Sequence, residues 1–95
     1  MRTVYKYVLE VTDTQTISLP QGAKPLHVGR LSQKRIFLWA EVDTDMAPTP
    51  QVFYIRGTGH PLPDTNCSYV GTVHSYIEGR PQGIPLIWHV YKQRG

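Results

Sequence analysis

Apolar and polar residues alternate along most of the chain, a pattern typical of β-strands that bury one face. The alternation is most regular from Lys34 to Val42, where Ile36, Leu38 and Ala40 share one face with Val42. The opposite face of the same segment carries Arg35, Phe37, Trp39 and Glu41. The pattern predicts six or seven strands, over residues 3–11, 16–19, 26–31, 34–42, 51–56, 68–77 and 84–91.

Helical periodicity is almost absent, because prolines recur and no long window spaces its apolar residues for a helix. A short helical turn around Pro63, Asp64 and Thr65 is the only helical element expected. Residues 43–50, which contain two prolines, are expected to break regular structure, and residues 78–83 to form an open hairpin loop. The sequence therefore predicts an all-β fold, either a small antiparallel sandwich or a partly open barrel of six to seven strands.

Length and charge narrow the class of protein further. A chain of 95 residues predicts a single domain, residues 1–95, and its one cysteine, Cys67, cannot form a disulfide within the chain. The net charge of +3 comes without a run of like charge, so nucleic acid is not an expected partner. No stretch resembles a signal peptide or approaches the roughly 20 apolar residues of a membrane helix. We expect a cytoplasmic protein with no membrane association.

Aromatic side chains fall on both faces of several predicted strands. Phe37 and Trp39 lie opposite Leu38, and Tyr54 lies opposite Phe53. Most aromatic residues must build the core, but so thin a core cannot bury both faces of each strand. The second face is therefore expected to meet a second sheet, another subunit or a ligand. Together with the open edges of such sheets, this predicts a homo-oligomer.

The segment from Arg56 to His60 is the most informative candidate site. The glycines on either side of Thr58 permit positive φ and close backbone approach, so that the N–H groups of Gly57, Thr58 and Gly59 can converge on an anion. Arg56 and His60 would add one fixed and one titratable donor to a phosphate or carboxylate. The same residues equally suit a tight loop in which His60 only bonds the backbone, and the sequence leaves both interpretations open.

Other chemistry finds little support in the residues. His60, Cys67, His74 and His89 lack the paired short spacings of a zinc site, and the two histidines within strands, His74 and His89, are expected to be half-buried and hydrogen-bonded. No sequence feature orients a base beside Cys67, and the carboxylates fall at strand ends and turns. We therefore expect no metal, no cofactor and no catalytic residue, and hence not an enzyme.

Four segments of the chain together resemble a family of short proteins encoded by tailed bacteriophages and prophages. These are TVYKYVLEVTDTQTISLPQGAKPLHVG, FLWAEVDTD, IRGTGHPLP and the closing YVGTVHSY with LIWHVY. The most specific parts are the (Arg/Tyr)-Gly-Thr-Gly-His-Pro box and the Leu-Trp-Ala-x-Val-Asp strand. The family is a domain of unknown function, so the resemblance implies an origin rather than an activity. The connection over residues 78–85 is longer and richer in Gly and Pro than is usual in the family.

A phage origin implies a host-directed role, because small accessory proteins of phages commonly act on host defence. The leading hypothesis is a non-enzymatic protein in the host cytoplasm that binds and sequesters a nucleotide-type immune signal. In it, Gly57, Thr58, Gly59 and Arg56 hold phosphate, His60 donates a further hydrogen bond, and Trp39 or Tyr54 stacks on the base. The alternatives are a protein–protein inhibitor of a host defence or metabolic enzyme, and a minor virion or assembly component. Alanine at position 56 or 60 is expected to abolish ligand binding without unfolding the protein.

Overall fold

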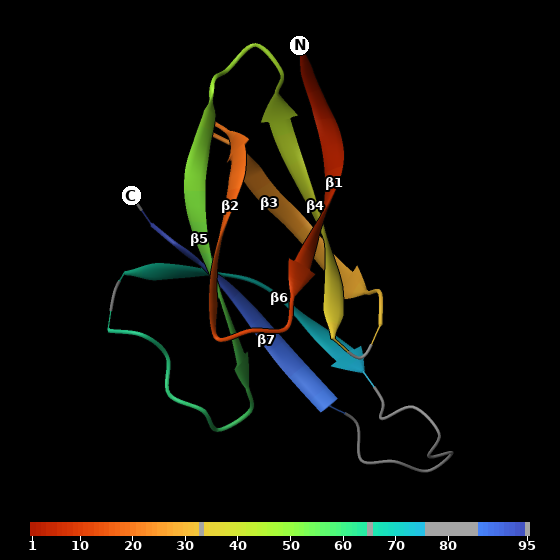
Figure 1. Cartoon of the computed structure of the whole chain (residues 1–95), viewed down its shortest axis with the longest axis vertical. Helices are drawn as coiled ribbons and strands as arrows, with labels where there is room; N and C mark the ends of the chain where they lie inside the picture. Colours follow the sequence, from red (N-terminus) through yellow and green to blue (C-terminus); the bar gives the residue numbers. More distant parts are fainter. Residues whose placement is uncertain (33, 65, 76–85, 95) are drawn as a thin grey trace.

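A computed structural model describes residues 1–32, 34–64, 66–75 and 86–94 of the chain. These residues contain seven antiparallel strands in two sheets and no helix (Figure 1). The three-stranded sheet has the order β1-β4-β3 and the four-stranded sheet the order β2-β5-β7-β6. The sheets do not close into a barrel, so the fold is a small all-β sandwich. The strands are β1 Arg2–Glu10, β2 Thr14–Pro20, β3 Lys24–Arg30, β4 Arg35–Asp43, β5 Pro48–Gly57, β6 Cys67–Ser75 and β7 Leu86–Gln93.

Each strand lies within a few residues of its predicted range, and in β4 burial follows the alternation of the sequence. In β4 the even-numbered side chains from Ile36 to Val42 are buried, whereas Phe37 and Trp39 on the opposite face are half-buried. In β5 Phe53 and Ile55 are buried in the core. The predicted strands over 68–77 and 84–91 are confirmed as far as Ser75 and from Leu86, and the predicted loop over 78–83 lies outside the described residues.

The expected break at residues 43–50 is wrong at its end, because Pro48 and Pro50 lie in β5 and pair with β2. The Ile55 N–H donates to the Asp13 carbonyl at 3.2 Å, so the odd-numbered residues of β5 make the hydrogen bonds to β2. The proline nitrogens therefore face the other side, where β7 pairs only from Phe53 onward. Proline is tolerated there because no ladder hydrogen bond is lost.

The helical turn predicted around Pro63 is also wrong for its described residues, Pro63 and Asp64, which are not helical. Proline disfavours helical geometry in the residue before it, so Pro63 disfavours a helix that includes Leu62. The Pro61 carbonyl instead accepts a hydrogen bond from the Arg56 side chain at 3.1 Å, which holds this segment beside β5. Thr65, the third residue of the prediction, lies outside the described residues.

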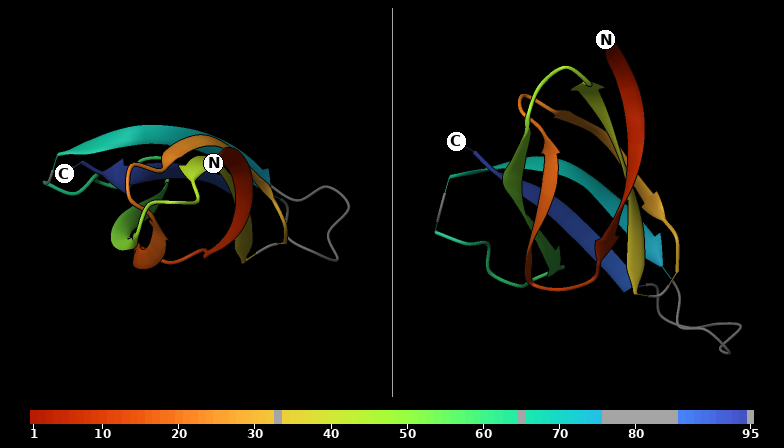
Figure 2. Two further views of the ribbon diagram at one scale, coloured as in Figure 1. Left: turned by 90° about the horizontal axis from the view of Figure 1, so that it is seen from above. Right: turned by 45° about the horizontal axis from the view of Figure 1, so that its top comes forward.

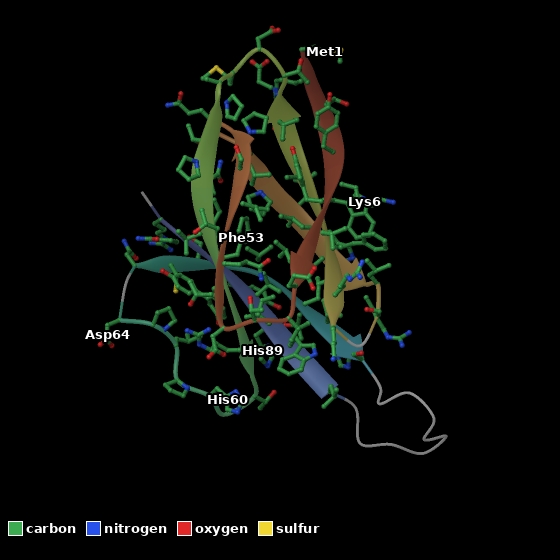
Figure 3. All side chains as sticks on the ribbon, in the orientation of Figure 1. Met1, Lys6, Phe53, His60, Asp64 and His89 are labelled. Carbon is green, nitrogen blue, oxygen red and sulfur yellow. The ribbon has the colours of Figure 1, made fainter. Side chains whose placement is uncertain are left out.

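The core is one cluster of aliphatic side chains around Phe53, which is fully buried (Figure 3). β3 of one sheet lies against β6 of the other, as both views in Figure 2 show. At this crossing Gly71 meets Val28 so closely that a Cβ at position 71 would lie 2.6 Å from the valine methyl group. The glycine therefore allows the two sheets to approach. Within the described ranges no helix is long and apolar enough to cross a membrane.

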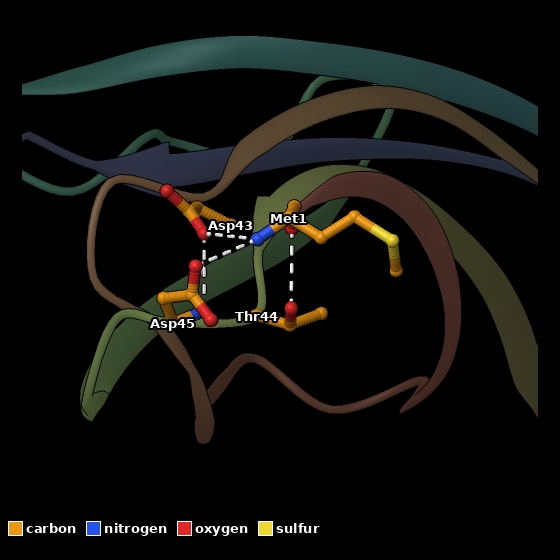
Figure 4. Close-up of polar contacts among 4 residues, drawn as sticks. All are labelled: Met1, Asp43, Thr44 and Asp45. Carbon is orange, nitrogen blue, oxygen red and sulfur yellow. Dashed lines mark hydrogen bonds and ion pairs between the residues drawn. The ribbon is translucent and has the colours of Figure 1, made fainter.

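The start of β1 is fixed by its amino group. The Met1 ammonium lies 3.1 Å from Asp43 Oδ1 and 2.8 Å from Asp45 Oδ2, in the turn after β4 (Figure 4). The Asp45 carboxylate, followed by that of Asp43, raises the pKa of the Met1 amine, while the Asp45 backbone N–H and then the ammonium lower the pKa of Asp43. The contribution of the protonated amine to the stability of the fold is therefore complete below its ordinary pKa of 8.0. This contribution is lost as the pH rises through the higher pKa of the folded state. The contribution of the ionised Asp43 carboxylate to stability is complete above its ordinary pKa of 3.8. It is lost as the pH falls through the lower pKa of the folded state.

This contact predicts the effect of Asp45→Asn on the reactivity of the amine. Loss of the carboxylate is expected to lower the pKa of the Met1 amine towards its ordinary value, because the Asp45 hydrogen bond is the largest cause of the rise. Only the deprotonated amine reacts with an acylating reagent, so its acylation near pH 8 should become faster. Asp64→Asn, a change at another exposed carboxylate, is the control and should leave the rate unchanged. Equal rates in all three proteins would contradict the contact.

Candidate functional site

The Gly-Thr-Gly-His segment forms a tight turn at the end of β5. The His60 N–H donates to the Gly57 carbonyl at 3.1 Å, and Gly59 has a φ of +88° while Thr58 has negative φ, the combination of a type II turn. Gly57 serves a different purpose, because a Cβ there would lie 3.1 Å from two atoms of the His60 ring. The first glycine lets the imidazole fold back over β5, and the second permits the turn. Among the described residues, no group accepts from the N–H of Thr58 or Gly59.

Arg56 ties this turn to the rest of the sandwich. Its Nε donates to the Pro61 carbonyl at 3.1 Å, and its Nη1 donates to the carbonyls of Asp13 and Ile55. The guanidinium also lies 5.6 Å from the centre of the Tyr54 ring, within reach of a cation–π contact. Arg56 is therefore first a structural residue that joins β5 to the β1–β2 turn. Its Nη2 group donates to none of the residues that the structure describes and remains available to a ligand.

His89 extends the site onto the neighbouring strand. Its Nε2 lies 2.9 Å from the Thr58 hydroxyl and its Nδ1 lies 3.1 Å from the Thr72 hydroxyl. Thr72 is in turn 2.5 Å from the Tyr69 hydroxyl. This chain of four side chains runs from the turn across β7 to β6. As expected for a strand histidine, His89 is half-buried and hydrogen-bonded, but His74 is exposed.

Cross-strand register arranges these residues in two rows on the outer face of the four-stranded sheet. Arg56 pairs with His89, and His89 pairs with Thr72; we call these three the polar row. In the tyrosine row, Tyr91 pairs with Tyr54 on one side and Tyr69 on the other. The rings of Tyr69 and Tyr91 are 5.5 Å apart in an edge arrangement, and Tyr69 is 59% exposed. The outer face thus carries an aromatic row directly beside a row of hydrogen-bonding groups.

A pocket of about 230 Å³ opens where the turn meets the polar row. It brings together five of the seven residues predicted from the sequence, and His60 and His89 lie at the same end of the molecule (Figure 3). No carboxylate lines it within the described part of the chain, so its charge favours an anion. The lining residues are Arg56, Gly57, Thr58, Gly59, His60, Leu62, His89 and Tyr91.

The two aromatic residues predicted to stack on a base lie in different places. Tyr54 belongs to the tyrosine row but is only 7% exposed beneath Arg56, and it does not line the pocket. Trp39 lies on β4 of the other sheet, where its ring contacts those of His27 and Phe37. It does not line the pocket.

Sequence reasoning missed the contribution of His89, Tyr91, Thr72 and Tyr69 to this site. The alternation of β7 does place His89 and Tyr91 on one face, but it does not say which strands lie beside β7. The structure inserts β7 between β5 and β6, although some 30 residues separate it from β5 in the sequence. The described residues contain no group of three His, Cys, Asp or Glu side chains that could hold a metal ion.

Comparison with known proteins gives a family for the whole chain. The family described as a domain of unknown function, DUF7352, matches residues 1–95. No curated protein and no solved structure matches the chain.

Proposed function

We propose that this chain, which belongs to the DUF7352 family, binds a phosphate-bearing nucleotide at the outer face of its four-stranded sheet. The observation that carries the proposal is the position of this pocket, which no carboxylate of the described residues lines, directly beside the tyrosine row. Phosphate needs convergent N–H and O–H donors, and a base needs an aromatic ring on which to stack. The two requirements are met side by side on β5, β7 and β6.

The phosphate would lie against the turn. The N–H groups of Thr58 and Gly59, the Nη2 group of Arg56 and the ring of His60 supply donors there. At about 230 Å³ the pocket accommodates a phosphate and part of a sugar, and is smaller than the ~300–1,000 Å³ typical of sites that enclose a whole ligand. The base therefore extends out of the pocket and over Tyr91 and Tyr69. Trp39 has no part in this arrangement.

The geometry favours binding over catalysis. Thr58 and His89 have the separation of a nucleophile and its base, 2.9 Å. The group on the far side of His89, however, is the Thr72 hydroxyl rather than a carboxylate, so an imidazolium formed during proton transfer gains no charged partner. The ligand would be held and released unchanged. This supports a protein that sequesters its ligand.

The biological setting we propose is a tailed phage or prophage. The resemblance of the Gly-Thr-Gly-His-Pro box and the other segments to small phage proteins supports this origin. In the host cytoplasm, a protein that binds a nucleotide-type immune signal without turning it over would counter host defence. No cofactor is needed for such a role.

A thermal-shift screen against cyclic dinucleotides, cyclic trinucleotides and ADP-ribose derivatives tests the function. A ligand at about 100 times its Kd stabilises the folded state by about 2.7 kcal/mol, which raises the Tm of a chain of this length by roughly 10–20 °C. We expect one class of nucleotide to do so and to be recovered intact by chromatography after denaturation. No shift with any class contradicts the function, and conversion of the ligand contradicts the non-enzymatic role. A host protein retained in stoichiometric amount, without a nucleotide, would instead favour an inhibitor.

Thr58→Val tests the link between the turn and the polar row. The change keeps the shape of the side chain but removes the hydroxyl that holds the turn against His89. The N–H donors of the turn are then less well positioned, so the affinity for the nucleotide identified in the screen should fall, by up to about tenfold for a bond of ~1.5 kcal/mol. Thr16→Val, at an exposed position of β2, is the matched control and should leave the affinity unchanged. Isothermal titration calorimetry measures both. Equal affinities in the two variants would remove Thr58 from the site.

A further inference from the structure

The outer edge of β1 is an open row of backbone hydrogen-bonding groups. The Val11 N–H donates to the Lys34 carbonyl at 2.8 Å and the Thr44 N–H donates to the Met1 carbonyl at 2.9 Å. Hydrogen-bonded pairs alternate in an antiparallel ladder, so the odd-numbered residues of β1 bond β4 and the even-numbered residues point their N–H and C=O groups outward. β1 is the terminal strand of its sheet, and it forms one side of the molecule (Figure 1).

One end of this edge is already capped from within the chain. The Glu10 N–H donates to Gln15 Oε1 at 3.0 Å, and Gln15 Nε2 donates to the Glu10 carbonyl at 2.5 Å. The amide side chain thus takes the place of a neighbouring strand at Glu10. The outward groups from Arg2 to Val8 have no partner among the described residues.

The basic side chains of β1 do not block pairing of another strand with this edge. Arg2 forms an ion pair with Glu41 at 2.5 Å, and the Lys6 ammonium lies 4.6 Å from the centre of the Phe37 ring, so both extend back over β4. Edge strands that avoid pairing usually project charge or carry proline. Here the edge instead presents Val4 at 51% and Val8 at 44% exposure, with Tyr5 at 46% on the other face.

We propose that a second copy of this chain pairs with β1 across a two-fold axis at Tyr5. In this antiparallel register Arg2 pairs with Val8 of the other copy, and Val4 pairs with Lys6. Every outward group from Arg2 to Val8 then gains a partner, no like charges are directly opposed, and the pairing ends where Gln15 caps Glu10.

The register shifted by one residue towards Glu10 is excluded on two grounds. A two-fold axis at Lys6 would place the two Lys6 side chains directly opposite each other, which is destabilising. It would also pair Arg2 with Glu10, whose backbone groups Gln15 already occupies. The favoured register joins the two three-stranded sheets into one sheet of two copies. The pocket lies on the other sheet and remains open, so this proposal does not rest on the proposed function.

Sedimentation equilibrium with Val4→Pro and Val4→Ala tests the pairing. The unmodified protein is expected at twice its chain mass of 10.8 kDa. Proline at position 4 removes only an outward N–H and leaves the ladder to β4 intact, so Val4→Pro should be a folded monomer with an unchanged circular dichroism spectrum. Val4→Ala keeps the N–H and should remain a dimer. A dimeric Val4→Pro variant would overturn the proposal. A monomeric unmodified protein would also overturn it and would leave a strand of another protein as the partner of this edge.

Cysteine cross-linking tests the register in the Cys67→Ser background. Tyr5 would face its own copy in a non-hydrogen-bonded pair, where Cα atoms lie about 4.5 Å apart, within the range of a disulfide. Tyr5→Cys is therefore expected to give a covalent dimer with oxidised glutathione, and Lys6→Cys is expected to give little. Efficient cross-linking through position 6 alone, or through neither position, would overturn the register.

Discussion

Replacing Phe53 with alanine is expected to lower the free energy of unfolding by about 3–5 kcal/mol, because the side chain is fully buried at the centre of the core. Against the ~5–15 kcal/mol that stabilises a typical domain, this loss leaves the chain close to unfolding. Phe37→Ala is the matched control, since Phe37 lies half-buried on the outer face of the other sheet. Its loss should be only about 1–2 kcal/mol.

Urea denaturation measures both values, and the two variants should shift the midpoint by clearly different amounts with similar slopes. Equal losses at positions 53 and 37 would mean that both faces of these strands are equally buried. That result would contradict the assignment of inner and outer faces from which the candidate site is built.

The second large effect is expected in ligand binding. Tyr91→Leu should weaken the binding of a nucleotide about tenfold to hundredfold, because stacking of a base on an aromatic ring contributes ~1–3 kcal/mol. Leucine keeps most of the buried apolar area, so the fold should persist. Trp39→Leu removes a larger aromatic ring from the other sheet and should leave the affinity unchanged. A loss confined to Trp39→Leu would move the base to the three-stranded sheet and contradict the site.

Arg56 illustrates how the structure changes a prediction made from the sequence. From the sequence alone, alanine at this position is expected to abolish binding without unfolding the protein. The guanidinium, however, donates to three backbone carbonyls, so its removal also frees the β1–β2 turn and the segment around Pro61. His60→Ala is the cleaner variant, because His60 is exposed and its ring makes no hydrogen bond to the residues that the structure describes.

The strands could be predicted because alternation is a local property of the sequence. The pairing of Pro48 and Pro50 could not, since it depends on which side of β5 carries a neighbour. The candidate site divides in the same way. The segment from Arg56 to His60 is continuous and was found directly. His89 and Tyr91 join it only because β7 lies between β5 and β6, an arrangement that no single segment of sequence contains.

We propose that a nucleotide binds at the turn and the tyrosine row, and an NMR titration is the most direct test of this binding. The nucleotide that stabilises the protein in the thermal-shift screen is added to the ¹⁵N-labelled chain, and amide and imidazole signals are followed. Saturable shifts are expected at Thr58, Gly59, His60, His89 and Tyr91, with the signals of Trp39 unchanged. Shifts centred on Trp39 and β4, or none at saturating ligand, would contradict it.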